Sequence, residues 1–268
     1  MIQKKSFPSE SSYLLPEPWR IIHPTETDNS EIKDFYLRKI RDGCRDKDTK
    51  LNILLLGEGS SGASFIKSCQ TALGRNVTTS QIADVVKLAA YDLEVEDGDT
   101  HAHLPVRLFD CRGLLDEERG VETEDTIQPG TPTNPNDENF LKKPGEKNKM
   151  HCVVYVLDAQ KIKSGDNFVR PTVKEQFEKV KEYLHTSCTL QLVLLTKIDR
   201  LGIRHIVQVC YDRRVKECCE IASSVLGVPL DDVLPQANHC NEATSFEGKD
   251  VITLYNIWKI MERAIEFM

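Results

Sequence analysis

The sequence predicts an α/β domain built around a mostly parallel sheet. From residue 51 onward, short apolar runs alternate with longer stretches of helical periodicity, which is the pattern of strand–helix–strand units. A glycine-rich turn follows the first apolar run and opens a helical stretch. Three polar motifs each follow the end of an apolar run, and the carboxyl ends of parallel strands meet at one edge of a sheet. The functional residues are therefore expected at that edge.

Six apolar runs are expected to form the strands of this sheet. They lie at 51–56, 91–95, 104–109, 152–157 and 190–195, with a short sixth near 232–234. The acidic turn at 96–99 predicts a hairpin between the second and third strands. Periodicity predicts helices at about 63–73, 172–185, 204–226 and 250–267, the last with Asp250 as its N-cap.

Shifts in composition divide the chain into three regions. Residues 1–50 are polar and contain four prolines, with helical periodicity only at 31–41, so we expect an N-terminal extension with one packing helix. Residues 51–268 are expected to form the α/β domain. Within it, 116–150 is acidic, then rich in Pro, Gly and Asn, then basic, which predicts a long insertion beside the second motif. A loop of that length inside a compact domain is usually functional or disordered.

The overall composition argues against several classes of protein. The 35 Lys and Arg residues and 42 Asp and Glu residues give a net charge of −7, which disfavours binding to nucleic acid or to an acidic membrane. No apolar run approaches the ~20 residues that span a bilayer, and no secretory signal or lipid-anchor motif is evident. Nine cysteines without a C-x-x-C pair argue against a disulfide framework or a four-thiolate zinc site. We expect a soluble cytoplasmic protein with reduced thiols.

The first motif is G-E-G-S-S-G-A-S at 57–64, between the first strand and the first helix of the domain. Its glycine spacing matches the P-loop, G-x-x-x-x-G-K-[ST], in which backbone N–H groups at the positive end of a helix surround phosphate oxygens. Ala63 stands where the P-loop lysine belongs, so that lysine is either substituted or deleted and phosphate binding should be weaker. The alternative is a strand–helix turn that binds nothing. The residues expected at the phosphates are Gly57, Ser60, Ser61, Gly62, Ala63 and Ser64, with the Ser64 hydroxyl also a ligand of Mg²⁺.

The second motif is D-C-R-G at 110–113, at the end of the third strand. Asp110 is expected to hold Mg²⁺ through water, and the Gly113 amide to sense a terminal phosphate. Thr79, or its neighbour Thr78, is a candidate switch residue that closes over the metal, and the alternative is a threonine that only caps the chain after a helix. Leu114 follows where many small GTPases place a water-orienting Gln, so slow or no hydrolysis is expected and no catalytic residue is assigned. The alternative for this motif alone is a simple turn.

The third motif is T-K-I-D at 196–199, which ends the fifth strand and matches the guanine-specificity sequence [N/T]-K-x-D. The Asp199 carboxylate can accept two N–H bonds from guanine, which adenine cannot offer. The Lys197 stem would lie over the ring. The alternative is a strand-terminal turn in which the aspartate caps a helix. The residues expected at guanine are Thr196, Lys197, Asp199 and, after the sixth strand, Asn238.

Further segments match one known family. They are P-W-R at 18–20, L-L-L-G at 54–57 with S-F-I at 64–66, M-H-C-V-V-Y-V-L-D-A at 150–159, L-G-V-P at 226–229 and V-L-P at 233–235. With T-K-I-D, they make the chain resemble the interferon-induced protein 44 and 44-like group of GTPase-like proteins. The resemblance implies a Ras-like P-loop GTPase fold, a cytoplasmic location and a role in the response to interferon or virus.

Two functions remain open. The order of the three motifs favours a guanine-nucleotide switch, in which GTP or GDP with Mg²⁺ reorders 75–90 and 113–150 and a protein partner reads the change. The missing lysine and Leu114 favour a pseudo-GTPase, an interaction scaffold that binds no nucleotide. We predict a GTPase-like protein with a degenerate P-loop and weak or absent nucleotide binding. It would act through an unidentified protein partner in innate immune and antiviral defence, without nucleic acid or a membrane anchor.

Overall fold

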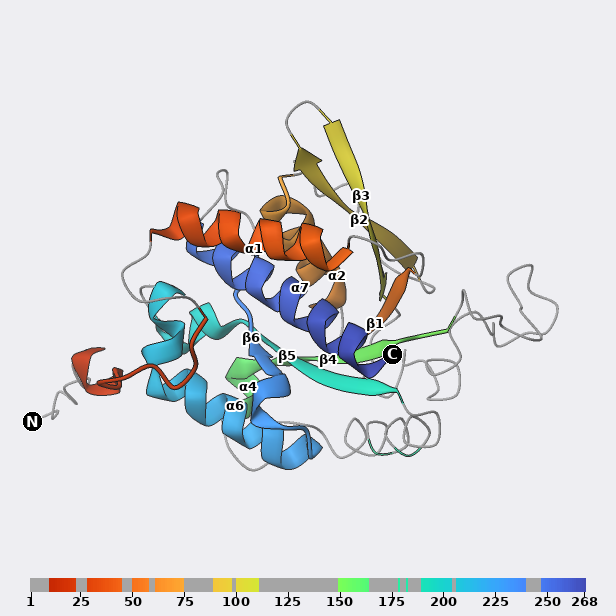
Figure 1. Ribbon diagram of the computed structural model, residues 1–268. Helices are drawn as coiled ribbons and strands as arrows, with labels where there is room; N and C mark the ends of the chain where they lie inside the picture. The colour runs from red at the N-terminus through yellow and green to blue at the C-terminus, as the bar shows by residue number, and fades with distance from the viewer. Residues whose placement is uncertain are drawn as a thin grey trace, which may run out of the picture.

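The computed structural model describes one sheet and the helices that flank it (Figure 1). The described residues are 10–22, 28–44, 50–57, 61–74, 89–97, 100–110, 149–163, 189–203, 206–239 and 247–268, with the single positions 178 and 182. The predicted insertion, apart from its last two residues, lies outside them, as does almost all of the predicted helix at 172–185.

Six strands form the sheet in the order β2-β3-β1-β4-β5-β6. They are β1 (Leu51–Gly57), β2 (Ala89–Asp97), β3 (Thr100–Asp110), β4 (Cys152–Asp158), β5 (Leu190–Thr196) and β6 (Val233–Pro235). All neighbours are parallel except β2 and β3, which form the predicted hairpin with Asp97 paired to Thr100. This is the strand order of the Ras-like P-loop GTPases, so the predicted fold class is confirmed.

Five α-helices lie among the described residues: α1 (Asn29–Cys44), α2 (Ser61–Ala72), α4 (Ala159–Lys163), α6 (Arg213–Leu226) and α7 (Glu247–Phe267). Short 3-10 segments are η1 (Glu10–Tyr13), η4 (Ile198–Leu201), η5 (Ile206–Tyr211) and η6 (Leu230–Asp232). None of the described helices is long and apolar enough to cross a membrane.

Two helix boundaries correct the sequence interpretation. The continuous helix predicted at 204–226 is wrong, because Asp212 has an extended backbone and its carboxylate accepts the Arg214 N–H, which caps α6. The stretch before it forms η5 instead. The prediction of Asp250 as the N-cap of the last helix is also wrong: α7 begins at Glu247, and Asp250 is fully buried in its first turn.

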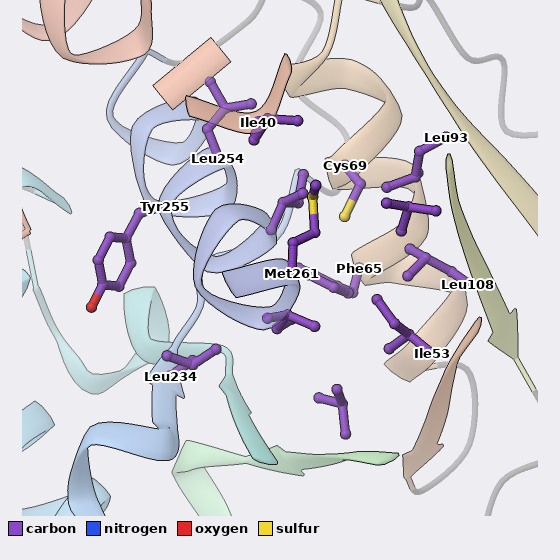
Figure 2. Close-up of a cluster of buried hydrophobic side chains, with 14 of the residues drawn as sticks. Ile40, Ile53, Phe65, Cys69, Leu93, Leu108, Leu234, Leu254, Tyr255 and Met261 are labelled. Carbon is purple, nitrogen blue, oxygen red and sulfur yellow. The ribbon is translucent and has the colours of Figure 1, made fainter. Parts of the chain in front are cut away.

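Successive side chains along a strand lie in two different buried apolar clusters, one on each face of the sheet. Ile53 and Leu55 of β1 lie in one buried cluster with α1, α2 and α7, whereas Leu54 and Leu56 lie in a second cluster with α4 and α6. Figure 2 shows part of the first cluster, in which Phe65 lies near side chains from β1, β3 and α7. Five described cysteines are buried free thiols in these clusters: Cys69, Cys152, Cys210, Cys218 and Cys219.

Helix α1, which the periodicity at 31–41 predicted, runs beside α7 (Figure 1). Its Tyr36 ring lies 5.6 Å from the Tyr255 ring and 5.5 Å from the Trp258 ring, measured between centroids. The Tyr36 hydroxyl donates to the Ile22 carbonyl. Residues from the N-terminal fifty therefore share the apolar core of the sheet.

The P-W-R segment at 18–20 binds to residues of η5, η6 and β6, near the β6 end of the sheet. The Trp19 indole donates to the Val209 carbonyl at 3.1 Å. The Arg20 guanidinium is buried and donates to the carbonyls of Val233 at 2.6 Å and Leu230 at 2.5 Å. These contacts give two of the residues that carry the family resemblance a structural role near β6.

Candidate functional site

The described residues of the three motifs lie at the carboxyl edge of the sheet, as predicted from the places of the motifs after strands. β1 ends at Gly57, β3 at Asp110 and β5 at Thr196, and the central strands run parallel. Asp158 ends β4, which lies between β1 and β5. The edge of a doubly wound sheet is where such folds bind ligands, so it is the candidate site.

Two glycines of the first motif lie where a Cβ atom would meet close neighbours. A Cβ at Gly57 would lie 2.5 Å from the Val156 carbonyl oxygen on β4, closer than real Cβ atoms approach. A Cβ at Gly62 would lie 2.9 Å from the Asp110 carboxyl carbon on β3. Glycine at these positions therefore lets β1 and α2 approach their neighbours, whether or not a phosphate binds.

The Asp110 carboxyl group sits against the first turn of α2. It is 4% exposed and accepts the backbone N–H of Ala63. Burial raises the pKa of Asp110 to about 7, although the hydrogen bond from Ala63 opposes that rise. The N–H groups at a helix N-terminus attract anions, and in a P-loop that anion is a phosphate. Here the Asp110 carboxyl group, rather than a phosphate, accepts one of those N–H groups, that of Ala63.

This arrangement does not fit a phosphate with Mg²⁺ as it stands. The Ala63 N–H is engaged by Asp110, and a carboxyl group whose pKa is raised to about 7 is a poorer ligand for a cation than an ordinary aspartate. Among the described residues no group of three or more His, Cys, Asp or Glu could hold a metal ion. Three predicted residues of the phosphate side lie outside the described part of the chain: Ser60, Thr79 and Gly113. Leu114, which stands where many small GTPases place a Gln, lies outside it too.

Two predicted serines of this side are described. Ser61 begins α2, and its hydroxyl oxygen is buried without a hydrogen-bond partner among the described residues. Ser64 is half-buried, and its backbone carbonyl accepts the Ser68 hydroxyl at 2.9 Å. The role of Ser64 as a metal ligand stays a prediction.

The base side is built on the turn after β5. The Thr196 hydroxyl donates to the Leu157 carbonyl at 2.8 Å, which ties the end of β5 to β4. Lys197 has a left-handed backbone, with φ 59°, at the start of η4. Its ammonium group pairs with Asp158 at 2.7 Å. This turn carries the chain away from the strand and leaves Asp199 at the edge.

Asp199 is partly exposed and lies beside a cation from another element. Its side chain is 31% exposed, and Lys249 of α7 places Nζ 4.0 Å from the Asp199 Oδ2 atom. The same Nζ donates to the Asn238 carbonyl at 3.0 Å. The structure thus brings predicted base residues from the ends of β5 and β6 together around Lys249.

Buried polar contacts hold the loop after β6 in place. The backbone N–H of His239 donates to the Ser68 hydroxyl oxygen of α2 at 2.9 Å. The same hydroxyl lies 3.4 Å from Asn238 Oδ1. The fully buried Asp250 carboxylate lies 2.9 Å from His239 Nε2 and accepts from Lys33 of α1 at 2.9 Å. Helices α1, α2 and α7 therefore all support this loop.

Sequence reasoning assigned no role to Asp158 or Lys249, and it gave Asp250 only the role of a helix N-cap. Asp158 could have been found, because it ends an apolar strand as Asp110 does. Lys249 has no such signal, since it reaches the site from the first turn of a helix whose start was misplaced.

Comparison with known proteins gives low but extended sequence similarity. No family model matches the chain. Human interferon-induced protein 44-like is 26% identical over 268 residues, covering 89% of this chain and 57% of the relative. The chain is similar to the interferon-induced proteins 44 and 44-like. Human interferon-induced protein 44 is 24% identical and covers 82% of this chain and 53% of its own length, and the mouse protein is 27% identical with shares of 81% and 55%.

The resemblance predicted from the motifs is confirmed by these relatives. The chain spans about half the length of the curated proteins it matches. A solved structure from work on dimerization and the GTPase activity of the chloroplast translocon components atToc33 and psToc159 is 14% identical. It covers 88% of this chain and 93% of its own length, with a TM-score of 0.47.

Proposed function

We propose that this chain is a GTPase-like protein that recognises the guanine base and holds the phosphates weakly. The observation that carries the proposal is the Asp199 carboxylate, which is 31% exposed at the end of β5 beside the loop of Asn238. A carboxylate fixed on a short turn can accept the N1 and N2 protons of guanine. Adenine presents no matching pair of donors, so such a site discriminates between the two bases.

Two features support weak phosphate binding. Ala63 provides no ammonium group for the phosphates, and losing one charge-assisted contact costs about 1.5–3 kcal/mol, or about ten- to a hundredfold in affinity. The Asp110 carboxyl group also accepts the Ala63 N–H, so this amide already has a partner where a P-loop amide would bind a phosphate oxygen. A nucleotide must displace that carboxyl group or bind without this amide.

The proposed cellular role rests on the names of the relatives. Those proteins are called interferon-induced, which supports a role for this chain in innate immune and antiviral defence. With weak phosphate binding, we propose action through a protein partner in the cytoplasm rather than through rapid hydrolysis. Mg²⁺ is proposed as the companion of GTP or GDP only when Asp110 leaves the first turn of α2.

A pseudo-GTPase scaffold that binds no nucleotide is the second candidate. It is favoured by the same contact, because Asp110 gives the Ala63 N–H a partner in the absence of phosphate. Under this alternative, Asp199 and Lys249 would form a partly buried ion pair, and the Ras-like fold would serve only to present protein-binding surfaces.

Titration separates the two candidates. The purified, nucleotide-stripped chain is titrated with fluorescent GDP, GTP and ATP, with and without Mg²⁺. The proposal predicts guanine-selective binding, and in Ala63→Lys a triphosphate affinity stronger by about ten- to a hundredfold. Binding of none of the three up to millimolar concentration supports the scaffold instead. Unchanged affinity in Ala63→Lys would show that the P-loop is misaligned.

A further inference from the structure

Lys249 occupies a position that is costly for a lysine. It lies in the first turn of α7, where the positive end of the helix dipole disfavours a cation, and its side chain is only 9% exposed. Removing an ammonium group from water adds a further cost unless acceptors replace the water. Two contacts that help to offset this cost are with the Asn238 carbonyl at 3.0 Å and with the Asp199 carboxylate at 4.0 Å.

Both of those contacts belong to the predicted base site. Asp199 follows β5 and Asn238 follows β6, so the Lys249 ammonium group lies between the two segments expected to read the base. At 4.0 Å, Lys249 and Asp199 attract each other without a direct hydrogen bond, which needs about 2.7–3.2 Å. A donor and an acceptor are thus held side by side at the edge of the sheet.

We propose that Lys249 is a specificity-determining residue of the base site and donates to O6 of guanine. This inference rests on the proposed function. Guanine presents an acceptor at O6 next to donors at N1 and N2, and the Lys249 ammonium group with the Asp199 carboxylate presents the complementary donor and acceptor. Adenine carries an amino group in place of O6, so it would set donor against donor. Lys249 therefore recognises the 6-oxo group, while Asp199 recognises the N–H groups.

Two altered bases separate these contacts. Inosine diphosphate keeps O6 and the N1 proton but lacks the 2-amino group, so its loss of affinity reports on Asp199. The diphosphate of 2-aminopurine riboside keeps the 2-amino group but lacks O6 and the N1 proton. The affinity ratio of GDP to the 2-aminopurine nucleotide therefore contains the Lys249 contact, and the ratio of GDP to inosine diphosphate does not.

The experiment measures both ratios by competition with fluorescent GDP on the full chain. In Lys249→Met, the preference for GDP over the 2-aminopurine nucleotide is expected to fall by about ten- to a hundredfold, because O6 loses a charge-assisted donor. The preference for GDP over inosine diphosphate should stay within about twofold. Lys259→Met removes a lysine farther along the same helix and serves as the matched control, with both ratios unchanged.

The outcomes distinguish a failure of the role of Lys249 from a failure of the proposed nucleotide binding. If Lys249→Met binds GDP and keeps the full preference over the 2-aminopurine nucleotide, the role of Lys249 is overturned and the proposed function stands. If the wild-type chain binds no nucleotide, the proposed function fails and this inference falls with it. Should Lys249→Met fail to fold, Lys249→Gln retains a neutral donor, and its ratio must fall between the wild-type value and the loss expected for Met.

Discussion

At the scale of single residues, Asp110 has an arrangement that its motif did not predict. The motif implies an ionised carboxylate that faces Mg²⁺, whereas the structure buries the carboxyl group against Gly62 and the Ala63 N–H. Sequence could predict that Asp110 ends a strand beside the first motif. It could not predict the burial, because that depends on how closely Gly62 lets α2 approach β3.

The raised pKa of Asp110 makes stability depend on pH. The folded chain holds a proton on Asp110 that the unfolded chain releases, so the stability from this group is present below about pH 4 and is lost as pH rises to about 7. Asp110→Asn cannot ionise. From pH 5 to pH 8, it should therefore gain about 2–3 kcal/mol of unfolding free energy relative to wild type, measured by urea denaturation.

Other titrating groups cancel in that comparison because both chains contain them. A difference between Asp110→Asn and wild type that stays constant from pH 5 to pH 8 would contradict the burial of the carboxyl group. Asp34→Asn makes the same chemical change at an exposed position on α1 and serves as the control.

At the scale of elements, the strands were predictable and two helix boundaries were not. Apolar runs such as Cys152–Asp158 are buried along almost their whole length, and that composition indicates a central parallel strand directly. Helix starts depend on which polar side chain caps the backbone. Asp212 caps α6, whereas Asp250, an equally good capping residue by type, lies inside α7 and forms buried polar contacts.

Those contacts predict that Asp250 stabilises the packing of α1, α7 and the loop after β6. Asp250→Ala would leave Lys33 and His239 without their carboxylate, and we expect a loss of about 2–4 kcal/mol in the free energy of unfolding. Chemical denaturation measures it. Glu262→Ala on the same helix removes a partly exposed pair with Lys259 and should cost no more than about 1 kcal/mol. Equal losses in the two variants would contradict the structural role of Asp250.

At the scale of the whole molecule, the chain order of the motifs predicted that they share one edge, since parallel strands bring their carboxyl ends together. It could not show which helices complete the site. The helices and strands predicted from the sequence include neither Lys249 nor His239. In the structure, Lys249 pairs with Asp199 of η4, and His239 bonds Ser68 of α2 and Asp250 of α7. The side chains that complete the site thus depend on tertiary packing rather than on motif spacing.

The division into an extension and a domain at residue 50 can be tested through Arg20. Because this buried guanidinium donates to the carbonyls of Leu230 and Val233, Arg20→Ala removes one donor from each, and we expect a loss of about 2–4 kcal/mol in the free energy of unfolding. If the N-terminal segment and the sheet unfold together, a single transition should shift to lower denaturant concentration. Arg38→Ala, exposed on α1, is the control and should change stability by less than about 0.5 kcal/mol. A shift no larger than that of Arg38→Ala, or a separate early transition, would mean that the first fifty residues fold apart from the sheet.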